Sequence, residues 1–440
     1  MRNFRIIISL ASLTSLFALV TCDMANDFET PYENYFIKYY GGDGKQTGVD
    51  MVVNTDGTIV MVGNSEVGIS KRIFFIRVDP KGNIITQKLL GGTNENVKDI
   101  EPTSDGGFVI LSEFQKSATN VDFKLIKVSL NGDEINSIEY GSPEPFGDFP
   151  SSVTPLANGG FVVAGRTEDI VAKGDPNNTE ADPGDIFLYK FSDQLLPIPN
   201  SNDNSWGEGT QGLAKQDGAV KYFEKLDGTG YCVAYTSENV AANNSTNSKV
   251  LFYFKVPDDG FPAPIANYSP PGSLNSFNTE IASAIELPFN EGYAITGRTI
   301  TGVGSQELFF CKMANMWWPN NEPANAPRRE VEIYTKISPE GSQGVAGISV
   351  GAVQVGPRGY LIAGNDLRQS GTTNIWLTKL DLLGEVKWSA SFGSDSGNDA
   401  AGAVAELPDG RILVLGTMEL EANLTRMVLI KLNASGKLLK

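Results

Sequence analysis

The stretch Asp105-Gly106-Gly107-Phe108-Val109-Ile110 decides the fold, because it joins a tight-turn signal directly to an apolar strand. Asp-Gly supplies the positive φ angles that a tight hairpin turn needs, and aromatic and β-branched residues favour a strand after it. The same element recurs six more times along the chain, at 56–63, 158–165, 227–234, 291–297, 359–364 and 409–416. The sequence is therefore that of a repeat protein.

A second element follows each copy of the first. It is an apolar strand with one basic residue at a fixed place, and these residues are Arg77, Lys127, Lys190, Lys255, Lys312, Lys379 and Lys431. Where no insertion intervenes, the repeat period is about 50 residues, as from Arg77 to Lys127. Two independent markers thus agree on seven units.

Each unit also contains a small-residue strand before the turn, as at 400–405, and a later strand that often ends in an aromatic residue and glycine, as at Tyr140-Gly141. Four short strands at this period are typical of a propeller blade. We therefore predict an all-β fold: a seven-bladed β-propeller with four-stranded antiparallel blades, over residues 33–440.

The two ends of the chain predict how the ring closes. Residues 35–42 match the outer strand of a unit, whereas the last unit ends just after its basic strand. We expect residues 33–42 to supply the outer strand of blade seven, so that the N-terminal strand closes the ring and no sheet edge stays open.

The seven basic residues favour structural ion pairs over an anion channel. A lysine on the third strand of a blade packs its aliphatic stem between blades and brings its ammonium to a carboxylate. Glu101, Glu286 and Glu406 recur near the end of the small-residue strand and are the expected partners.

The N-terminus predicts export. Arg2 and Arg5 precede an apolar stretch over 6–20 that fits the core of a signal peptide. Leu19-Val20-Thr21-Cys22 resembles a bacterial lipobox, in which the cysteine is diacylated and becomes the first residue of the mature protein. We assign 1–21 to a lipoprotein signal peptide and 22–32 to a tether, and expect Cys22 to carry the lipid, palmitate included; a plain secretory signal is the alternative.

Candidate binding residues lie in insertions between the repeats, because loops usually carry function on a propeller. Trp206, Trp317 and Trp318 are candidate partner-binding residues, since tryptophan is enriched at interface hot spots. With Trp376 they are also candidate sugar-stacking faces, and Trp317 and Trp318 alternatively form the core of their own loop. A weak calcium candidate comprises Asp175, Asn177, Asp182 and Asp185, but it lacks the spacing of an EF-hand, so an ordinary acidic loop is favoured and no metal site is assigned.

Composition excludes several classes of function. The chain has no histidine, which removes Ser-His-Asp and Cys-His chemistry and His-ligated metals. A formal net charge of −17 disfavours binding to nucleic acid. Cys232 and Cys311 lie in different predicted blades, so we expect no disulfide. We predict no cofactor and no enzymatic activity.

The Asp-Gly-Gly-(Phe/Tyr) repeats resemble those of β-propeller lipoproteins in the cell envelope of Bacteroidetes. The resemblance covers nearly the whole mature chain and implies a protein anchored to the outer membrane by lipid, plausibly at the cell surface. It implies a scaffold for protein interaction, or an accessory subunit, with other cell-envelope proteins as partners. A carbohydrate-binding module that takes glycans is the alternative, and a glycan-active propeller enzyme is a third reading.

Overall fold

The computed structural model describes residues 34–168, 185–198, 205–206, 215–224, 230–238, 249–256, 263–268, 278–287, 292–302, 305–313, 331–337, 348–352, 359–368, 370–394 and 397–438. Among these residues no helix is long and apolar enough to cross a membrane. Every named element is a β-strand.

In the described part of the chain the strands pair into seven sheets. The first contains β2 (Lys45–Gln46), β3 (Asp50–Val53), β4 (Ile59–Val67), β5 (Ser70–Val78) and β6 (Ile84–Leu90). The second contains β7 (Glu95–Pro102), β8 (Phe108–Gln115), β9 (Val121–Val128) and β10 (Glu134–Tyr140). The third contains β11 (Asp148–Pro155), β12 (Phe161–Thr167), β13 (Asp185–Phe191) and β14 (Ser205–Trp206).

The fourth sheet contains β15 (Lys215–Glu224), β16 (Gly230–Glu238), β17 (Lys249–Val256) and β18 (Ala263–Tyr268). The fifth contains β19 (Asn278–Glu286), β20 (Tyr293–Gly302), β21 (Ser305–Met313) and β22 (Val331–Ile337). The sixth contains β23 (Ile348–Ala352), β24 (Gly359–Leu367), β25 (Thr373–Asp381) and β26 (Val386–Phe392). The last contains β27 (Ala400–Glu406), β28 (Ile412–Glu421), β29 (Leu424–Leu432) and β1 (Phe36–Tyr40).

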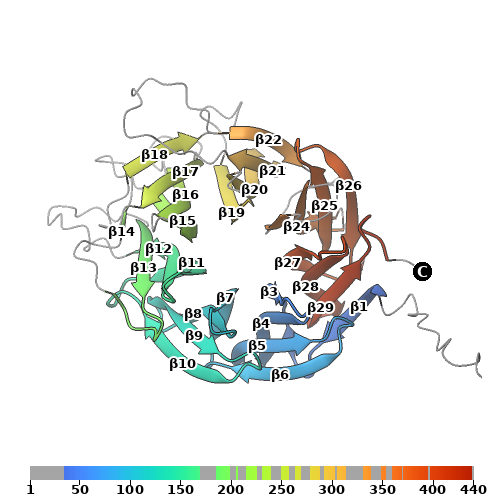
Figure 1. Ribbon diagram of the computed structural model, residues 1–440, viewed down its shortest axis with the longest axis horizontal. Helices are drawn as coiled ribbons and strands as arrows, with labels where there is room; N and C mark the ends of the chain where they lie inside the picture. Colours follow the sequence, from blue (N-terminus) through green and yellow to red (C-terminus); the bar gives the residue numbers. More distant parts are fainter. Residues whose placement is uncertain are drawn as a thin grey trace, which may run out of the picture.

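The sheets stand side by side around a central opening, with β3, β7, β11, β15, β19 and β27 at the inner edge (Figure 1). Consecutive strands of a sheet pair antiparallel from the inner strand outward, as in the order β7, β8, β9, β10. The chain is therefore an all-β propeller with four-stranded antiparallel blades.

The two ends of the chain meet in one sheet. Strand β1 pairs antiparallel with β29, with Phe36 opposite Lys431 and Tyr40 opposite Met427. The strand order is β1-β29-β28-β27, so the first strand of the chain lies outside the last three (Figure 1). The side chains of Phe36 and Tyr40 are buried against this sheet and the next, which ties the pairing to the core.

The core consists of clusters between neighbouring sheets, because each sheet is apolar on both faces. One cluster packs Phe75 of β5 against Ile110 and Ile126 of the second sheet. Another stacks Phe123 of β9 on Phe187 of β13, with ring centroids 5.7 Å apart. Cys232 and Cys311 are buried free thiols, in agreement with the expectation of no disulfide, and burial raises the pKa of both.

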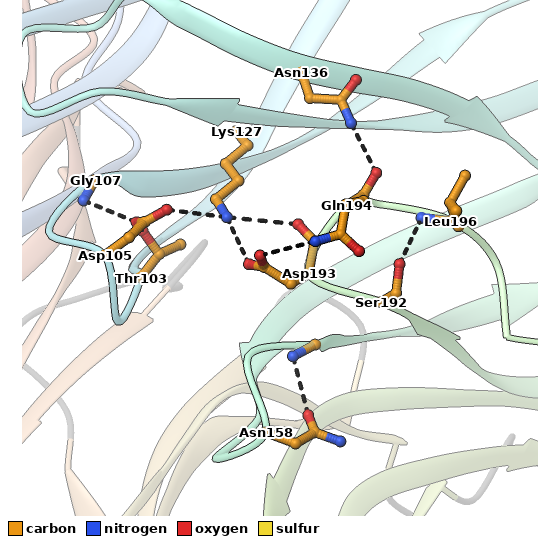
Figure 2. Close-up of polar contacts among 11 residues, drawn as sticks. Thr103, Asp105, Gly107, Lys127, Asn136, Asn158, Ser192, Asp193, Gln194 and Leu196 are labelled. Carbon is orange, nitrogen blue, oxygen red and sulfur yellow. Dashed lines mark hydrogen bonds and ion pairs between the residues drawn. The ribbon is translucent and has the colours of Figure 1, made fainter.

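Basic residues of the third strands join neighbouring sheets, as Figure 2 shows for Lys127. Its Nζ lies 3.0 Å from Asp105 Oδ2, in the turn before β8 of the same sheet, and 2.5 Å from Asp193 Oδ1, in the turn after β13 of the next sheet. Arg77 likewise contacts Asp56 of its own sheet (3.5 Å) and Asn131 of the next (3.0 Å). Lys431 donates to Pro80 O in the neighbouring sheet at 2.7 Å.

These contacts correct part of the sequence prediction. Glu406 does pair with a basic residue of the predicted set, since its Oε2 lies 2.5 Å from Lys379 Nζ. Lys127 pairs with Asp105 and Asp193, in two turns, rather than with a glutamate of the expected set. Glu101 pairs instead with Lys221, a residue outside the basic set, and Glu286 lies in the wall of the central cavity.

Candidate functional site: the central cavity

The inner strands share a local irregularity that sets which side chains face the centre. In β7 the register shifts between Val97 and Asp99, and β15 shifts in the same way between Ala219 and Lys221. Strands β11, β19 and β27 carry matching shifts. An extra residue in a strand reverses the alternation of side chains beyond it. Ile100 therefore points into the core, while Asp99 and Glu101 line the centre.

The centre of the ring encloses a cavity of about 900 Å³. Its described wall comes from β3, β7, β11, β15, β19 and β27. The wall is uneven: β3, β7 and β15 supply several charged side chains, whereas β19 and β27 supply mainly Ala, Gly and Ser in 282–284 and 401–403, with Glu286 as the charged residue of β19. Most of the charge thus lies on one side of the cavity and most of the small residues on the other.

An ion-pair cluster forms the charged side. Lys221 Nζ lies 2.6 Å from Glu101 Oε1 and 3.2 Å from Asp99 Oδ2, and it donates to Val153 O at 3.3 Å. Burial by itself lowers the pKa of the Lys221 ammonium, but the two carboxylates outweigh it and raise the pKa above its ordinary value. Lys221 is therefore a fixed cation between three strands of neighbouring sheets.

Asp50 continues this cluster toward β3. Burial first, and then the charge of the neighbouring Asp99 carboxylate, raise the pKa of Asp50 well above its usual range. Burial likewise raises the pKa of Glu101, against the opposing effect of Lys221. The cluster therefore contains carboxyl groups that hold protons more tightly than solvent-exposed ones.

Side chains at one recurring position also link the inner strands, which do not pair as a sheet. Asp50 Oδ2 accepts from Ile100 N at 3.1 Å, and Asp99 Oδ2 accepts from Val153 N at 2.9 Å. In the next strand Ser152 Oγ donates to Val220 O at 2.8 Å. Each bond joins a residue of one inner strand to the backbone of the next, so these side chains have a structural role in the ring.

The charged cluster is chemically suited to hold a polar ligand or to stiffen the ring. Among the described residues, no group of three or more His, Cys, Asp or Glu side chains is placed to bind a metal ion. The Lys221 ammonium neutralises part of the acidic charge of Asp99 and Glu101, and its donors are directed to these carboxylates and to Val153 O.

Most residues predicted from the sequence lie outside the described residues. These are Cys22, Trp317, Trp318, Asp175, Asn177 and Asp182. Trp206 and Asp185 are described by their backbone, which pairs with Ile186 and Thr167 respectively. The prediction that Trp376 offers a sugar-stacking face was wrong, because its side chain is buried in the core between the fifth and sixth sheets.

Asp50, Asp99 and Lys221 were not predicted as site residues from the sequence. Each is a charged residue within an inner strand, and that signal was available. The bulges in β7 and β15 hid the direction of Asp99 and Lys221, because simple alternation places every second residue of a strand on the same face.

Comparisons with known proteins agree with the fold. The model of a β-propeller family described as "Domain of unknown function (DUF5122) beta-propeller" matches residues 407–438. No curated protein matches the chain. Among solved structures, the polysaccharide lyase Uly1 is 11% identical, with a TM-score of 0.50, over 91% of this chain and 92% of that chain.

Two further solved structures are similar in extent. A protein of unknown function from Dyadobacter fermentans is 10% identical, with a TM-score of 0.49, over 90% of this chain and 97% of its own. The periplasmic gluconolactonase PpgL of Pseudomonas aeruginosa is 12% identical, with a TM-score of 0.48, over 81% of this chain and 95% of its own. At such identities the likeness of the lyase shows the β-propeller fold alone.

Proposed function

We propose that this protein is a lipoprotein of the bacterial outer membrane, anchored through Cys22, whose propeller acts as a protein-interaction scaffold or accessory subunit of a cell-envelope complex. The proposal includes a ring of seven blades closed by the N-terminal strand. The seven sheets of the described chain and the pairing of β1 with β29 support this part.

The observation that carries the scaffold proposal is the mutual pairing of Lys221 with Asp99 and Glu101. A catalytic centre keeps reactive groups available to a substrate, whereas this cluster joins neighbouring inner strands. The chain also lacks histidine, the commonest general acid–base residue. These features favour a structural interior and a function carried outside it.

The spacing of the strands supports a role for the connecting segments. Residues 116–120 separate β8 from β9, whereas residues 168–184 separate the corresponding strands β12 and β13. The connection from β21 to β22, over 314–330, contains Trp317 and Trp318. Long connections on a rigid ring are where propellers vary, and tryptophan is a frequent binding anchor.

Affinity purification of the full chain, tagged at the C-terminus, from detergent-solubilised membranes tests the scaffold proposal. We expect one or more envelope proteins to co-purify in stable proportion. Lys387→Ala changes a half-exposed residue on the outer strand β26. This variant is the control, and we expect the same proteins to co-purify with it. Purification of the chain alone, from membranes in which it is intact, would contradict the proposal.

The anchor is tested separately by metabolic labelling with a palmitate analogue. The wild-type chain is expected to carry the label and to fractionate with outer membranes, whereas Cys22→Ala is expected to lose both properties. A Cys22→Ala chain that is still labelled and membrane-bound would refute the lipid anchor without bearing on the choice of partner.

Glycan binding in the central cavity is the second candidate, and the cavity itself favours it. About 900 Å³ lies within the range of ligand pockets, and its wall combines charged and small residues. Ala282, exposed in this wall, is a site where a bulky side chain would fill the space. If polysaccharide retards the chain in affinity electrophoresis and Ala282→Trp abolishes the effect, this candidate replaces the scaffold proposal.

A further inference from the structure

A buried polar corner lies where the second sheet meets the third. It surrounds Gly141-Ser142, the first two residues of the connection from β10 to β11. Asn120 and Asp122 reach it from the start of β9, Asp148 from the start of β11, and Thr167 from the end of β12. All four side chains are almost fully buried, with exposed fractions of 0%, 1%, 0% and 1%.

Part of this corner is hydrogen-bonded. Ser142 N donates to Asp148 Oδ2, and Asn120 Nδ2 donates to Ser142 O at 3.4 Å. The hydroxyls of Ser142 and Thr167 lie 3.3 Å apart. At the surface, Lys116 Nζ lies 2.7 Å from Asp122 Oδ2. These contacts hold the connection between the two sheets in place.

Three oxygens of the corner remain without a hydrogen-bond partner in the described structure: Asn120 Oδ1, Asp122 Oδ1 and Asp148 Oδ1. A buried acceptor without a partner is costly, and more so on an ionised carboxylate. Burial raises the pKa of Asp148 against hydrogen bonds from the Thr167 hydroxyl and from the backbone and side chain of Ser142, and the charge of Asp122 adds to the rise. A cation beyond the Lys116 ammonium would satisfy these three oxygens.

In the equivalent corner, between β25 and β27, backbone donors satisfy both oxygens of the buried carboxylate. Asp399 Oδ2 accepts from Ser394 N and its Oδ1 from Glu419 N, both at 2.9 Å. Asn374 occupies the place of Asp122, and its amide fits between Ser394 O (3.0 Å) and Arg368 Nη2 (2.9 Å).

The two corners differ in charge. Beside Asp399 stands the neutral Asn374, which contacts the guanidinium that Arg368 shares with Asp366, whereas beside Asp148 stands the carboxylate of Asp122, which pairs with Lys116. Asp122, at the position that Asn374 has in the other corner, is therefore the residue that makes its corner different.

We propose that the corner of Asn120, Asp122 and Asp148 binds a Ca²⁺ ion through these three oxygens. Ca²⁺ prefers carboxylate and amide oxygens and completes its shell with hydroxyl or water oxygens. Asp122 and Asp148 together supply two negative charges, of which Lys116 offsets one at the solvent side. The ion ties the second sheet to the third, and its three ligands are other residues than the weak calcium candidate predicted from the sequence.

Calorimetric titration with CaCl₂ and thermal unfolding with CaCl₂ or EDTA test the site in the mature full chain. We expect one site that is saturated at submillimolar Ca²⁺ or below and a midpoint of unfolding several degrees higher in CaCl₂. Asp122→Asn, which copies Asn374, is expected to fold, to bind Ca²⁺ at least tenfold more weakly and to lose the shift. Asp105→Asn, which removes an exposed carboxylate elsewhere, is the matched control and is expected to keep both.

Asp148→Ala tests the same site but removes the acceptor of Ser142 N, so its folding is checked first by circular dichroism. The proposal is overturned if CaCl₂ does not stabilise the wild-type chain, or if Asp122→Asn and Asp105→Asn respond to it equally. In that outcome the two carboxyl groups share a proton, and Asp122→Asn stabilises the chain in EDTA at neutral pH.

Discussion

Lys127 Nζ lies 2.5 Å from Asp193 Oδ1, across the boundary between the second and third sheets (Figure 2). The ammonium is almost buried, with 8% of the side chain exposed, while Asp193 and Asp105 are about half exposed, at 46% and 48%. The pair therefore combines a desolvated cation with two anions that solvent screens in part.

Lys127→Met should weaken the boundary between these sheets. Charge-assisted hydrogen bonds contribute roughly 1.5–3 kcal/mol, and solvent screening reduces this to an expected loss of roughly 1–2 kcal/mol. Urea unfolding followed by fluorescence measures the loss. Lys387→Met, which removes a half-exposed pair with Asp381, is the control and should cost less than about 1 kcal/mol. Equal losses in the two variants would show that the boundary contact has no special role.

The same contact predicts a dependence on acid pH. Hydrogen bonds from Thr103 first, and then from Lys127, lower the pKa of Asp105 to about 2. A carboxyl group whose pKa is lower in the folded chain stabilises it above the unfolded value of roughly 4, and the contribution disappears as the pH falls toward the folded value.

Thermal unfolding of wild type and Asp105→Asn from pH 6 to pH 2 checks this sign. The wild-type chain should be the more stable at pH 6, and the two midpoints should converge near pH 2. A difference that grows as the pH falls would contradict the assignment.

Lys221→Met should destabilise the chain at neutral pH, because it leaves Asp99 and Glu101 without their cation. Removing one partner of a buried pair costs roughly 3–5 kcal/mol, and we expect the lower end because Lys221 keeps 19% of its side chain exposed. In the variant the carboxyl groups prefer the protonated form, so the loss should shrink as the pH falls below 5 or so. Chemical unfolding at pH 7 and pH 4.5 measures both values, and a loss that is the same at both pH values would exclude this explanation.

Deletion of residues 34–40 should abolish cooperative unfolding. It removes β1, exposes the edge of β29 and takes Phe36 and Tyr40 out of the core. Differential scanning calorimetry of the truncated chain measures the effect, with deletion of 439–440 as the control. A truncated chain with the wild-type midpoint would show that the N-terminal strand does not close the ring.

Much of the fold was readable from turn chemistry, because Asp-Gly and Asn-Gly mark hairpins and the basic residue marks the third strand of each sheet. Gly57, Gly106, Gly159 and Gly410 of these turns all have positive φ, as the signal requires. The N-terminal strand was recognised as an outer strand by its likeness to the strands that end in an aromatic residue and glycine.

The charged partners were not readable in the same way. Lys127 pairs with Asp193, which lies 66 residues later in the chain, in a turn of another sheet. No local sequence pattern predicts such a contact. In the inner strands the bulge at Lys98 reverses the alternation, so Asp99 and Glu101, rather than Ile100, face the cavity. The corner of Asp122 and Asp148 is likewise visible only after the second and third sheets are placed together.

The central claim is that the interior of the ring is structural and that binding resides in the connecting segments. Affinity purification from solubilised membranes with two variants tests it most directly: Glu101→Gln changes the interior, and Trp317→Ala with Trp318→Ala changes a connecting segment. We expect the interior variant to keep the co-purifying protein, and the tryptophan variant, with an unchanged midpoint of unfolding, to lose it. Loss of the partner in Glu101→Gln and its retention in the tryptophan variant would contradict the account.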